Sequence, residues 1–523
     1  MLLATMLNTS CSGKAANAAS PAAVASADSD STANPVSVRT MEELMLPDTS
    51  YASVKAMDYR VENEDSDAHP LQYFDDLYAQ SSNVMTFRRN LLRNADFGGR
   101  VEGTPSAIEI AWTFQTEYDN TPTKFGTWGG GTGWTGQPLY MHWTADETAQ
   151  LRKEEKTLTA DFGDEEVMVG SLCGKAFFIN YHTGRASRQP LDLHNVVKGT
   201  MSKDPEMPLL YVGQGVTKNE PLGCQAFSLL TRERLTFFND PKAWRSWQAF
   251  DSSPVVVGGY LFWPGENGSL FKFERTERGL RLLSRLRYRV RGSAPGIESS
   301  LCVYRNYGFF SDNHGNVVCV NLNNMRPVWH YKNLDDSDGT PVCREEQGVP
   351  YIYTACEVDK QGAQGICHFV KLRALTGEQV WECKINCHRV ELPGKTLDGG
   401  MYATPLLGSG DCENMIFANI CRNGASSSKG ELTALSTETG EVLWTVPYGI
   451  FAWSSPVKFL NERNEMFVFT GDANGNVYLV RGKTGEVLVK KAVGFNFESS
   501  PCVVGNTAVV GARGRNIYKF VIK

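Results

Sequence analysis

The sequence predicts an all-β protein built from about eight repeated units, and three observations lead to that fold class. The chain has 523 residues with 49 glycines and 11% aromatic residues, a composition that favours strands and turns over helices. A triplet of two small residues and proline, followed by a β-branched strand and a glycine-containing turn, recurs along it. Short apolar segments alternate with hairpin turns, as in antiparallel meanders. One meander cannot cover both of its faces, so the pattern predicts blades stacked around an axis, a β-propeller.

The clearest repeats begin at Asp251 and Trp453. Asp251-Ser252-Ser253-Pro254 leads into Val255-Val256-Val257, and Trp453-Ser454-Ser455-Pro456 stands in the same frame. From Pro254 onward the steps are roughly 40 to 64 residues, near the length of a four-stranded blade. The same frame recurs at six further positions, namely Pro138, around Pro208, Leu301, Pro341, Pro405 and Pro501.

The last unit predicts how the ring closes. Ser499–Lys523 ends without the aromatic outer strand of the other units, whereas Ile108–Phe114 alternates as a strand does and carries Trp112. We expect this amino-terminal strand to pair with the carboxy-terminal unit. The predicted fold of residues 107–523 is therefore an eight-bladed propeller of four-stranded antiparallel blades, closed by that pairing.

Residues 1–35 resemble a bacterial lipoprotein signal followed by a tether. Met1–Leu7 is apolar, Cys11 follows, and the Ala- and Ser-rich run Ala15–Pro35 is too polar to form a packed core. Asn8 departs from the usual signal, and a basic region is missing. We expect export to the periplasm or outer membrane of a bacterium with a lipid on Cys11 as the only membrane contact. The alternative is a disordered cytoplasmic extension with an incidental cysteine.

Residues 36–106 form an amino-terminal extension that is predicted to be partly helical. Helical stretches are expected around Glu42–Leu46 and Leu71–Leu92, where aromatic and aliphatic residues recur at near-helical spacing. Two interpretations stay open, a strap that packs on the propeller and an arm that binds a partner.

Charge and cysteine content exclude some functions. A net charge of −6 over this length argues against nucleic acid, and the basic stretch Arg275–Arg291 alternates with leucine like a solvated strand face. Cys356 and Cys367 are symmetric about a turn, so they could form a disulfide across a hairpin. Cys383, Cys387 and His388 lack a paired second cluster, so no metal site is predicted there.

Candidate ligand-binding residues precede the predicted inner strands, near one mouth of the axial channel. Convergent carboxylates at such a mouth can hold a cation or act as acid and base, whereas the simpler interpretation is solvated acids at a rim. With eight blades, Glu298 and Glu498 are expected nearly opposite one another. The glycine-rich run Thr127–Trp134 is expected to form a loop over this mouth, and its glycines do not follow a phosphate-binding pattern. The candidates are Asp251, Glu298, Asp338, Trp453 and Glu498.

A Thr-Gly motif with a following tryptophan carries a resemblance to a known family. Ala434-Leu435-Ser436-Thr437-Glu438-Thr439-Gly440-Glu441-Val442-Leu443-Trp444 is similar to the repeat of pyrroloquinoline-quinone (PQQ) propellers, with Ser in place of Asp, and Thr376–Trp381 matches its second half. The resemblance covers roughly Ile108–Lys523. It implies that tryptophans of the outer strands dock one blade on the next without binding the quinone, namely Trp112, Trp329, Trp381 and Trp444.

The resemblance implies two classes of function. One is a non-catalytic envelope propeller similar to BamB-type lipoproteins, a monomer that binds envelope proteins or peptide segments in outer-membrane protein assembly. The other is a dehydrogenase that needs PQQ and calcium. No two cysteines are adjacent, unlike the pair of many such enzymes, and no Cys-x-x-Cys-His haem motif occurs. The first class is therefore expected, without catalytic residues or cofactor, and a propeller that binds a carbohydrate or small ligand is a third possibility.

Overall fold

The computed structural model describes residues 54–63, 73–134, 136–392 and 395–523. The described chain is almost entirely β, with one α-helix, α2 (Ala145–Glu154), and two 3-10 turns, η1 (Val54–Ala56) and η2 (Gly410–Cys412). Helix α2 begins with a capping box in which Thr144 and Glu147 satisfy each other's backbone amides. No helix among the described residues is long and apolar enough to cross a membrane. Cys11, the tether and the expected helix at 42–46 lie outside the described residues.

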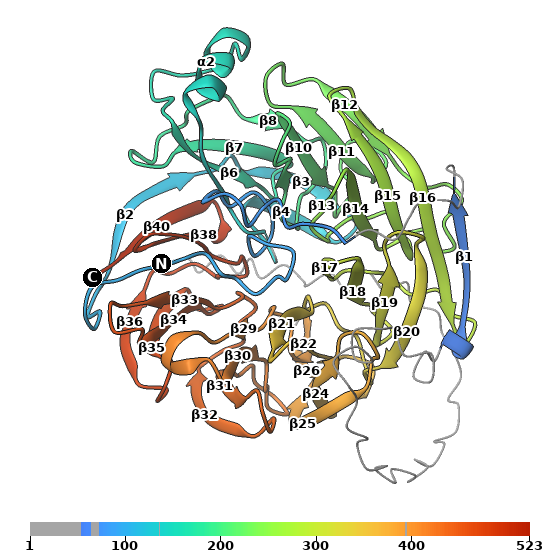
Figure 1. Ribbon diagram of the computed structural model, residues 1–523. Helices are drawn as coiled ribbons and strands as arrows, with labels where there is room; N and C mark the ends of the chain where they lie inside the picture. The colour runs from blue at the N-terminus through green and yellow to red at the C-terminus, as the bar shows by residue number, and fades with distance from the viewer. Residues whose placement is uncertain (1–53, 64–72, 135, 393–394) are drawn as a thin grey trace.

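Eight antiparallel sheets of four or five strands lie radially around a common centre in the described chain (Figure 1). The first four, in chain order, are β5 (Leu139–His142), β6 (Glu165–Gly170), β7 (Lys175–Asn180) and β8 (Leu191–Asp192); β9 (Ser202–Lys203), β10 (Leu209–Gly213), β11 (Cys224–Ser228) and β12 (Arg234–Phe238); β13 (Val255–Val257), β14 (Tyr260–Gly265), β15 (Ser269–Thr276) and β16 (Gly279–Val290), with β1 (Met57–Asn63) added beside β16; and β17 (Cys302–Tyr304), β18 (Tyr307–Ser311), β19 (Asn316–Asn321) and β20 (Arg326–Lys332).

The other four sheets complete the circle in Figure 1. They are β21 (Val342–Glu346), β22 (Val349–Ala355), β24 (Gln364–Arg373) and β25 (Gln379–His388); β29 (Leu406–Leu407), β30 (Met415–Ile420), β31 (Gly430–Ser436) and β32 (Val442–Tyr448); β33 (Val457–Leu460), β34 (Met466–Gly471), β35 (Asn476–Arg481) and β36 (Val487–Ala492); and β37 (Cys502–Val504), β38 (Thr507–Gly511), β40 (Asn516–Ile522) and β2 (Ile108–Gln115). Three small sheets join β3 (Asp119–Thr123) to β4 (Gly126–Gly131) and β39 (Arg513–Gly514), β23 (Glu357–Val358) to β28 (Gly399–Gly400), and β26 (Val390–Leu392) to β27 (Lys395–Leu397).

The first and last sheets of the circle are joined through β2. This strand pairs antiparallel with β40, from Ile108 opposite Ile522 to Gln115 opposite Asn516. Trp112 of β2 then reaches the sheet β5–β8, where its Nε1 donates to the carbonyl of Tyr181 at 2.9 Å. The two ends of the repeat array therefore touch each other.

Tryptophans of outer strands contact the Thr-Gly turn of the next sheet. Trp381 of β25 donates from Nε1 to the Thr437 carbonyl at 3.0 Å and covers Gly440. A Cβ added to Gly440 would lie 2.6 Å from the Trp381 ring, and the glycine has a φ of +77°. Only glycine fits that backbone and that contact. The other pairs of this kind are Trp112 with Gly184, Trp329 with Gly377 and Trp444 with Gly485.

The small residues before the inner strands form hydrogen bonds from sheet to sheet. The amide of Ser253 donates to the Ser300 hydroxyl at 2.9 Å, and the amide of Ser300 donates to the Thr340 hydroxyl at 3.0 Å. In the same way, the Thr340 amide donates to the Thr404 hydroxyl, and the Thr404 amide donates to the Ser455 hydroxyl. These positions require a short hydroxyl side chain, because the backbone amide donates to the hydroxyl of the next sheet while the hydroxyl accepts from the amide of the previous sheet.

Residues 84–101, which we call the strap, run across the inner strands. The strap forms a hydrogen bond to an inner strand of each of the eight sheets, or to a residue beside it. The bonded positions are Tyr140, Lys203, Pro254, Val303, Cys343, Pro405, Pro456 with Leu460, and Gly505. The first interpretation of the extension, packing on the sheets, describes this segment.

The helix expected over 71–92 does not form in its described part, residues 73–92. Arg88, Arg89 and Arg93 have φ values of +58°, +70° and +56°, which a right-handed helix cannot contain. The Arg88 amide donates to the Gln137 side chain at 3.0 Å, and the amides of Arg89 and Arg93 close isolated turns on the carbonyls of Thr86 and Asn90. The near-helical spacing of apolar residues reflects contacts to the sheets beneath them.

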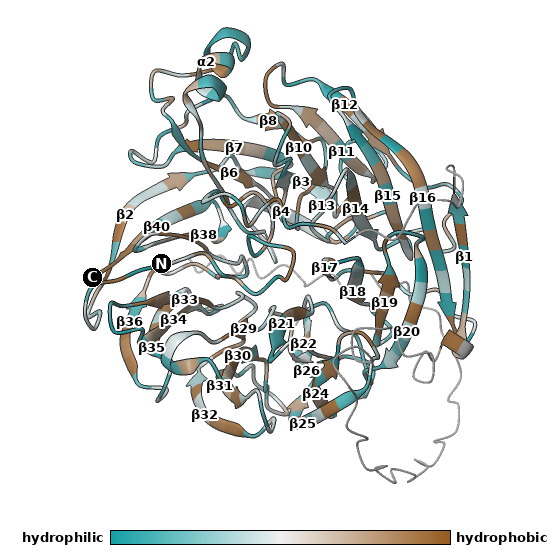
Figure 2. Cartoon of the chain, in the orientation of Figure 1, coloured by the Kyte–Doolittle hydropathy of each residue, from teal (hydrophilic) through white to brown (hydrophobic). Residues whose placement is uncertain are grey.

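The basic stretch is buried in its middle and solvated toward its ends, where Arg278, Arg281 and Arg291 are exposed. Arg285 and Arg287 of β16 are nearly buried, and Glu62 of β1 accepts hydrogen bonds from both, at 2.8 and 3.0 Å. Asp240 accepts a further bond from Arg285 at 2.8 Å. The prediction of a solvated face was wrong at Arg285 and Arg287, because β1, far away in sequence, covers them. Hydrophobic and hydrophilic residues are mixed along outer strands such as β16 and β20 (Figure 2), whereas strands nearer the centre, such as β10 and β34, are buried along their whole length.

The expected disulfide between Cys356 and Cys367 is absent from the described chain, where both thiols are free. Cys356 lies opposite His368, whose amide donates to its sulfur at 3.2 Å. Because neighbouring residues of a strand point to opposite faces, Cys367 faces away from Cys356.

Candidate acidic site at the centre of the sheets

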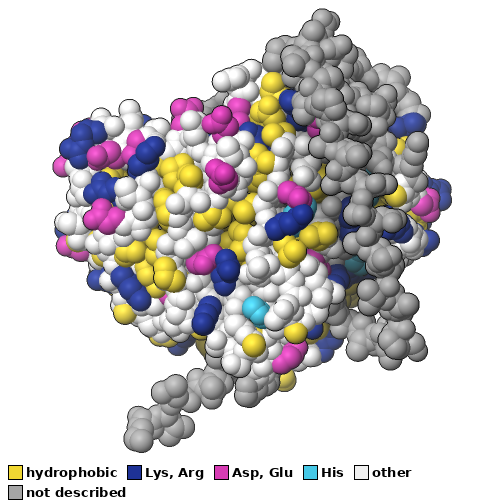
Figure 3. All heavy atoms as spheres, turned by 90° about the horizontal axis from the view of Figure 1, so that it is seen from below, with side chains coloured by type: hydrophobic (Ala, Val, Ile, Leu, Met, Phe, Trp, Pro, Cys, Tyr) yellow, Lys and Arg dark blue, Asp and Glu magenta, His cyan; other side chains and the backbone are white. Residues whose placement is uncertain are grey.

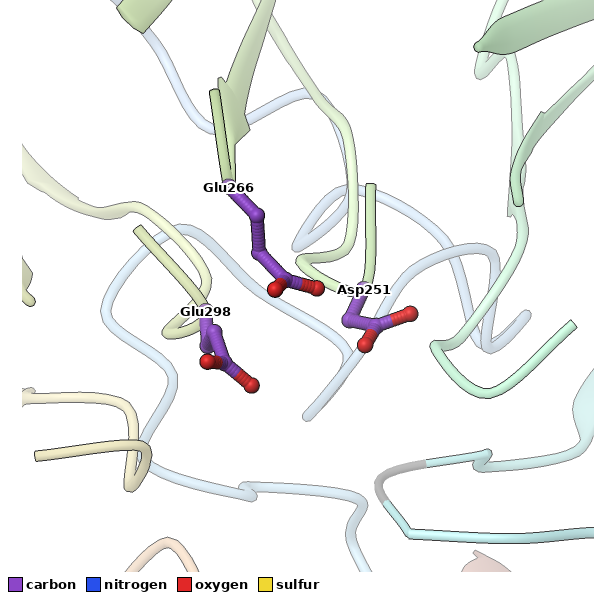
Figure 4. A group of neighbouring side chains, drawn as sticks. All are labelled: Asp251, Glu266 and Glu298. Carbon is purple, nitrogen blue, oxygen red and sulfur yellow. The ribbon is translucent and has the colours of Figure 1, made fainter. Parts of the chain in front are cut away.

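Two of the predicted residues, Asp251 and Glu298, come together with a third acid, Glu266. One oxygen of each side chain lies within 4.8 Å of the others, and Figure 4 shows the three carboxyl groups around a shared space. We call this set the first acid group. Asp251 and Glu298 stand before β13 and β17, as the repeat frame predicts. Glu266 lies in the turn between β14 and β15. Its backbone amide donates a hydrogen bond to the Ala249 carbonyl, which holds Glu266 at the centre.

The first acid group is buried and incompletely satisfied. Asp251 forms an ion pair with Lys198, which comes from the preceding sheet. Asp251 Oδ1 and Glu266 Oε1 accept no hydrogen bond from any described residue, although the two side chains are only 1% and 3% exposed. A buried carboxylate oxygen without a donor is costly. The group therefore needs a proton or a cation there.

A second acid group contains Asp338 with Asp336 and Glu357. These three also place one oxygen each within 4.8 Å of one another. Lys360 lies beside them, with its Nζ 3.6 Å from Asp336 Oδ2. Asp338 is the predicted residue of this group, while Asp336 and Glu357 stand outside the repeat frame and were not foreseen.

Crowding and burial raise the pKa of several of these acids. Burial and the neighbouring Glu298 and Asp251 raise the pKa of Glu266 well above its usual value. Burial raises the pKa of Glu298 to about 7, with Asp336 and Asp251 adding to the shift and Lys198 opposing it. Asp338 and Glu357 are shifted in the same direction by burial and by the acids around them. The two groups therefore share one electrostatic environment.

The remaining predicted residues, Trp453 and Glu498, belong to neither acid group. Trp453 is buried and stacks on Tyr402, with 4.9 Å between ring centroids. It belongs to an apolar cluster with Trp134 and Phe451. Glu498 accepts from Asn496 at 2.7 Å and lies 3.5 Å from Arg513. The centre therefore has acids on some sheets and aromatic rings on others, and three of the five predicted residues, Asp251, Glu298 and Asp338, lie in acid groups.

The glycine-rich run 127–134 is a packed element rather than an open loop. Its strand β4 pairs with β3 and β39. Cβ atoms on Gly130 and Gly131 would lie 2.2 and 2.0 Å from the carbonyl oxygens of Glu117 and Ala512. These glycines permit close backbone packing.

The acids predict a specific loss of stability as pH rises. Folding raises the pKa of Glu298 from the ordinary value near 4.3 to about 7, so its contribution is fully present below pH 4.3 and disappears as pH rises through 7. We expect Glu298→Gln to remove about 3 kcal/mol of this pH-dependent loss in urea unfolding between pH 4.5 and 7.5. Glu498→Gln, at the equivalent repeat position outside both groups, is the control. Equal pH profiles for wild type and Glu298→Gln would contradict this assignment.

The sheets and their repeated contacts define an all-β chain with the fold of the PQQ-like propellers, as the repeat motif indicates. The family described as outer membrane protein assembly factor BamB matches residues 428–523. No curated protein matches the chain in sequence.

Solved structures agree on the fold. The chain is similar to a quinohemoprotein alcohol dehydrogenase from Pseudomonas putida, with 12% identity, a TM-score of 0.58, and coverage of 84% of this chain and 80% of that chain. The chain is also similar to a europium-containing methanol dehydrogenase, with 11% identity, a TM-score of 0.58, and coverage of 85% of this chain and 99% of that chain. BamB from Moraxella catarrhalis gives 11% identity, a TM-score of 0.49, and coverage of 79% of this chain and 100% of that chain, a TM-score too low to support a shared fold. At these identities the likeness concerns the fold alone.

Proposed function

We propose that this chain is a non-catalytic propeller of the cell envelope that binds other proteins through the outer edges of its blades. The eight sheets act as one closed ring, since β2 pairs with β40 and Trp112 docks on the first sheet. A closed ring leaves only the outermost strands with free edges. The observation that carries the proposal is the apolar surface on three of these strands.

Exposed valines lie at the start of β25, β32 and β36. Val442 and Val487 are equivalent, two residues after the Thr-Gly glycine of their sheet, and Val380 lies three residues after that of β25. Val380, Val442 and Val487 are 42%, 46% and 42% exposed, and Leu443 beside Val442 is 49% exposed. Each strand is the last of its sheet in the described chain. Figure 3 views the molecule from this side and shows hydrophobic side chains among scattered charges. Neighbouring blades therefore offer a partner a repeated apolar contact beside an open edge.

The chain itself provides a precedent for adding a strand at such an edge. β1 pairs with the outermost strand β16 over its full length, from Met57 opposite Val290 to Asn63 opposite Ser284. Its Glu62 side chain neutralises arginines on that strand. An extended segment of a partner protein can bind β32 in the same way, with apolar side chains over Val442 and Leu443.

The family match supports the cellular setting. Residues 428–523, which match the outer membrane protein assembly factor, include β32 and β36. We propose that the protein lies in the periplasm or at the outer membrane, is anchored by a lipid on Cys11 and takes part in outer-membrane protein assembly.

The double variant Val442→Lys, Val487→Lys tests the edge. Burying a valine is worth about 1.5 kcal/mol or more, so placing two charges there should reduce the yield of co-purified envelope partners at least tenfold. The control is Thr113→Lys, an exposed position on the outermost strand β2 that lacks the valine. Thermal melts check that all variants fold. Unchanged partner yield in the double variant would contradict the proposal, as would PQQ-dependent oxidation of alcohols or sugars by the purified chain.

A PQQ- and calcium-dependent dehydrogenase is the second candidate, and the first acid group favours it. Carboxylate oxygens are ligands that calcium prefers, and Asp251 Oδ1 and Glu266 Oε1 have no hydrogen-bond donor among the described residues. Asp251, Glu266 and Glu298 fit a hard cation, which would polarise a bound carbonyl. The missing pair of adjacent cysteines places this candidate second.

A further inference from the structure

A pocket of about 550 Å³ opens beside the acid groups, outside both of them. Five connections form its walls: the turn between β3 and β4, the segment between β12 and β13, the segment between β16 and β17, the turn between β18 and β19, and the turn after β23. Its volume lies in the range of small-ligand sites. We call it the basic pocket, because its charged lining residues are Lys124, Arg245 and Lys360 and no lining residue is acidic.

Arg245 is the central cation of the basic pocket. Its guanidinium packs against the backbone at Gly296, where an added Cβ would lie 2.7 Å from Nη1. Within the residues that the structure describes, the Arg245 side chain forms no hydrogen bond and no ion pair. A half-buried guanidinium has five N–H donors in a planar fork, which matches the two oxygens of a carboxylate.

The other polar groups keep the pocket positive. Lys360 is shared with the second acid group through Asp336, whereas Lys124 has no acid beside it and lies over aromatic rings. Burial, Lys360 and Arg245 lower the pKa of His314 to about 4, so the imidazole is neutral at pH 7. An anion that enters the pocket therefore meets two cations that no described carboxylate pairs with directly.

Two aromatic rings form the apolar wall. Phe125 and Trp247 pack edge to face, with 5.5 Å between ring centroids. The Lys124 ammonium lies 4.5 Å from the Trp247 ring and 4.7 Å from the Phe125 ring. Such a wall accepts a flat ring better than a hydrated inorganic ion.

We propose that the basic pocket binds a small carboxylate that carries a flat apolar ring, with the carboxylate on Arg245 and Lys124 and the ring against Trp247 and Phe125. This site is separate from the blade edges of the proposed function. It gives the propeller a small-molecule ligand in addition to its protein partner.

Benzoate is the probe, titrated into the full chain by calorimetry, with neutral benzamide and inorganic sulfate as comparison ligands. We expect one benzoate to bind with a Kd of about 1 mM or tighter, and benzamide and sulfate each to bind at least tenfold more weakly. Arg245→Gln should weaken benzoate binding about tenfold or more, since a charge-assisted pair is lost.

Lys124→Gln is a second test variant, at an exposed residue that the fold does not need. We expect it to lose benzoate affinity severalfold. Lys153→Gln, an exposed lysine of α2, is the control and should keep wild-type affinity. Absence of saturable benzoate binding would overturn the proposal. So would equal affinity for benzamide, or wild-type affinity in both Arg245→Gln and Lys124→Gln. None of these results bears on the Val442 and Val487 edge.

Discussion

Replacing Gly440 by alanine should destabilise the protein by about 3 to 4 kcal/mol in urea unfolding. Two costs add. The residue has a φ of +77°, where an L side chain costs roughly 1 to 2 kcal/mol. The new Cβ would also lie 2.6 Å from the Trp381 ring, and forcing a packed ring aside costs about 1 to 3 kcal/mol.

Gly505→Ala separates the two costs. Gly505 also has a positive φ, +57°, but a Cβ there meets no atom within 4 Å. We expect a loss of about 1 kcal/mol from backbone strain alone. If Gly440→Ala and Gly505→Ala lose the same free energy, the docking of Trp381 on the Thr-Gly turn contributes nothing and the account of blade contacts is wrong.

Replacing Arg88 by methionine should cost about 3 kcal/mol or more. Arg88 is fully buried in the strap and donates to the carbonyls of Pro405 and Pro456 at 2.7 and 2.8 Å, which stand beside the inner strands of two sheets. Burial lowers its pKa to about 9, so it remains charged at neutral pH. Methionine leaves both buried carbonyls without a donor, and each such loss costs roughly 1 to 3 kcal/mol.

Arg89→Met is the matched control. Arg89 has the same left-handed backbone but is only partly buried, and it donates to the Ser81 carbonyl at 2.8 Å in its own segment. We expect a loss below about 1 kcal/mol, measured by the same urea titration. A smaller loss in Arg88→Met than in Arg89→Met would show that the strap does not tie the sheets together.

The strands, the hairpin turns and the tryptophan contacts could be predicted because they depend on local patterns. Short apolar strands between hairpin turns recur along the chain, and the Thr-Gly turn and the small-small-Pro triplet recur in several units, where they form the same kinds of contact. The unit expected around Pro208 was misplaced. Its inner strand β9 begins at Ser202, before Pro208, and follows Thr200 instead of a proline.

The acidic site could be predicted only in part. Asp251 and Glu298 precede inner strands, so the repeat frame places both near the centre. Glu266 and Glu357 occupy equivalent positions, since their amides donate to the carbonyls of Ala249 and Asp336, each two residues before a predicted position. Other repeats have Asn313, Ala473 and Arg513 at this position, so the repeat frame does not predict an acid there. Whether a side chain on such a turn faces the centre or the solvent depends on the neighbouring sheets.

Repetition along the chain was enough to predict an all-β fold of stacked meanders, because a strand's buried face and its turns are encoded within a few residues. The path of the strap, the cover of β1 over Arg285 and Arg287, and the meeting of Glu266 with Asp251 depend on segments that are distant in sequence. Such contacts form only when the blades stand around one centre, since their free energy comes from burying charges and carbonyls that separate segments supply to one another.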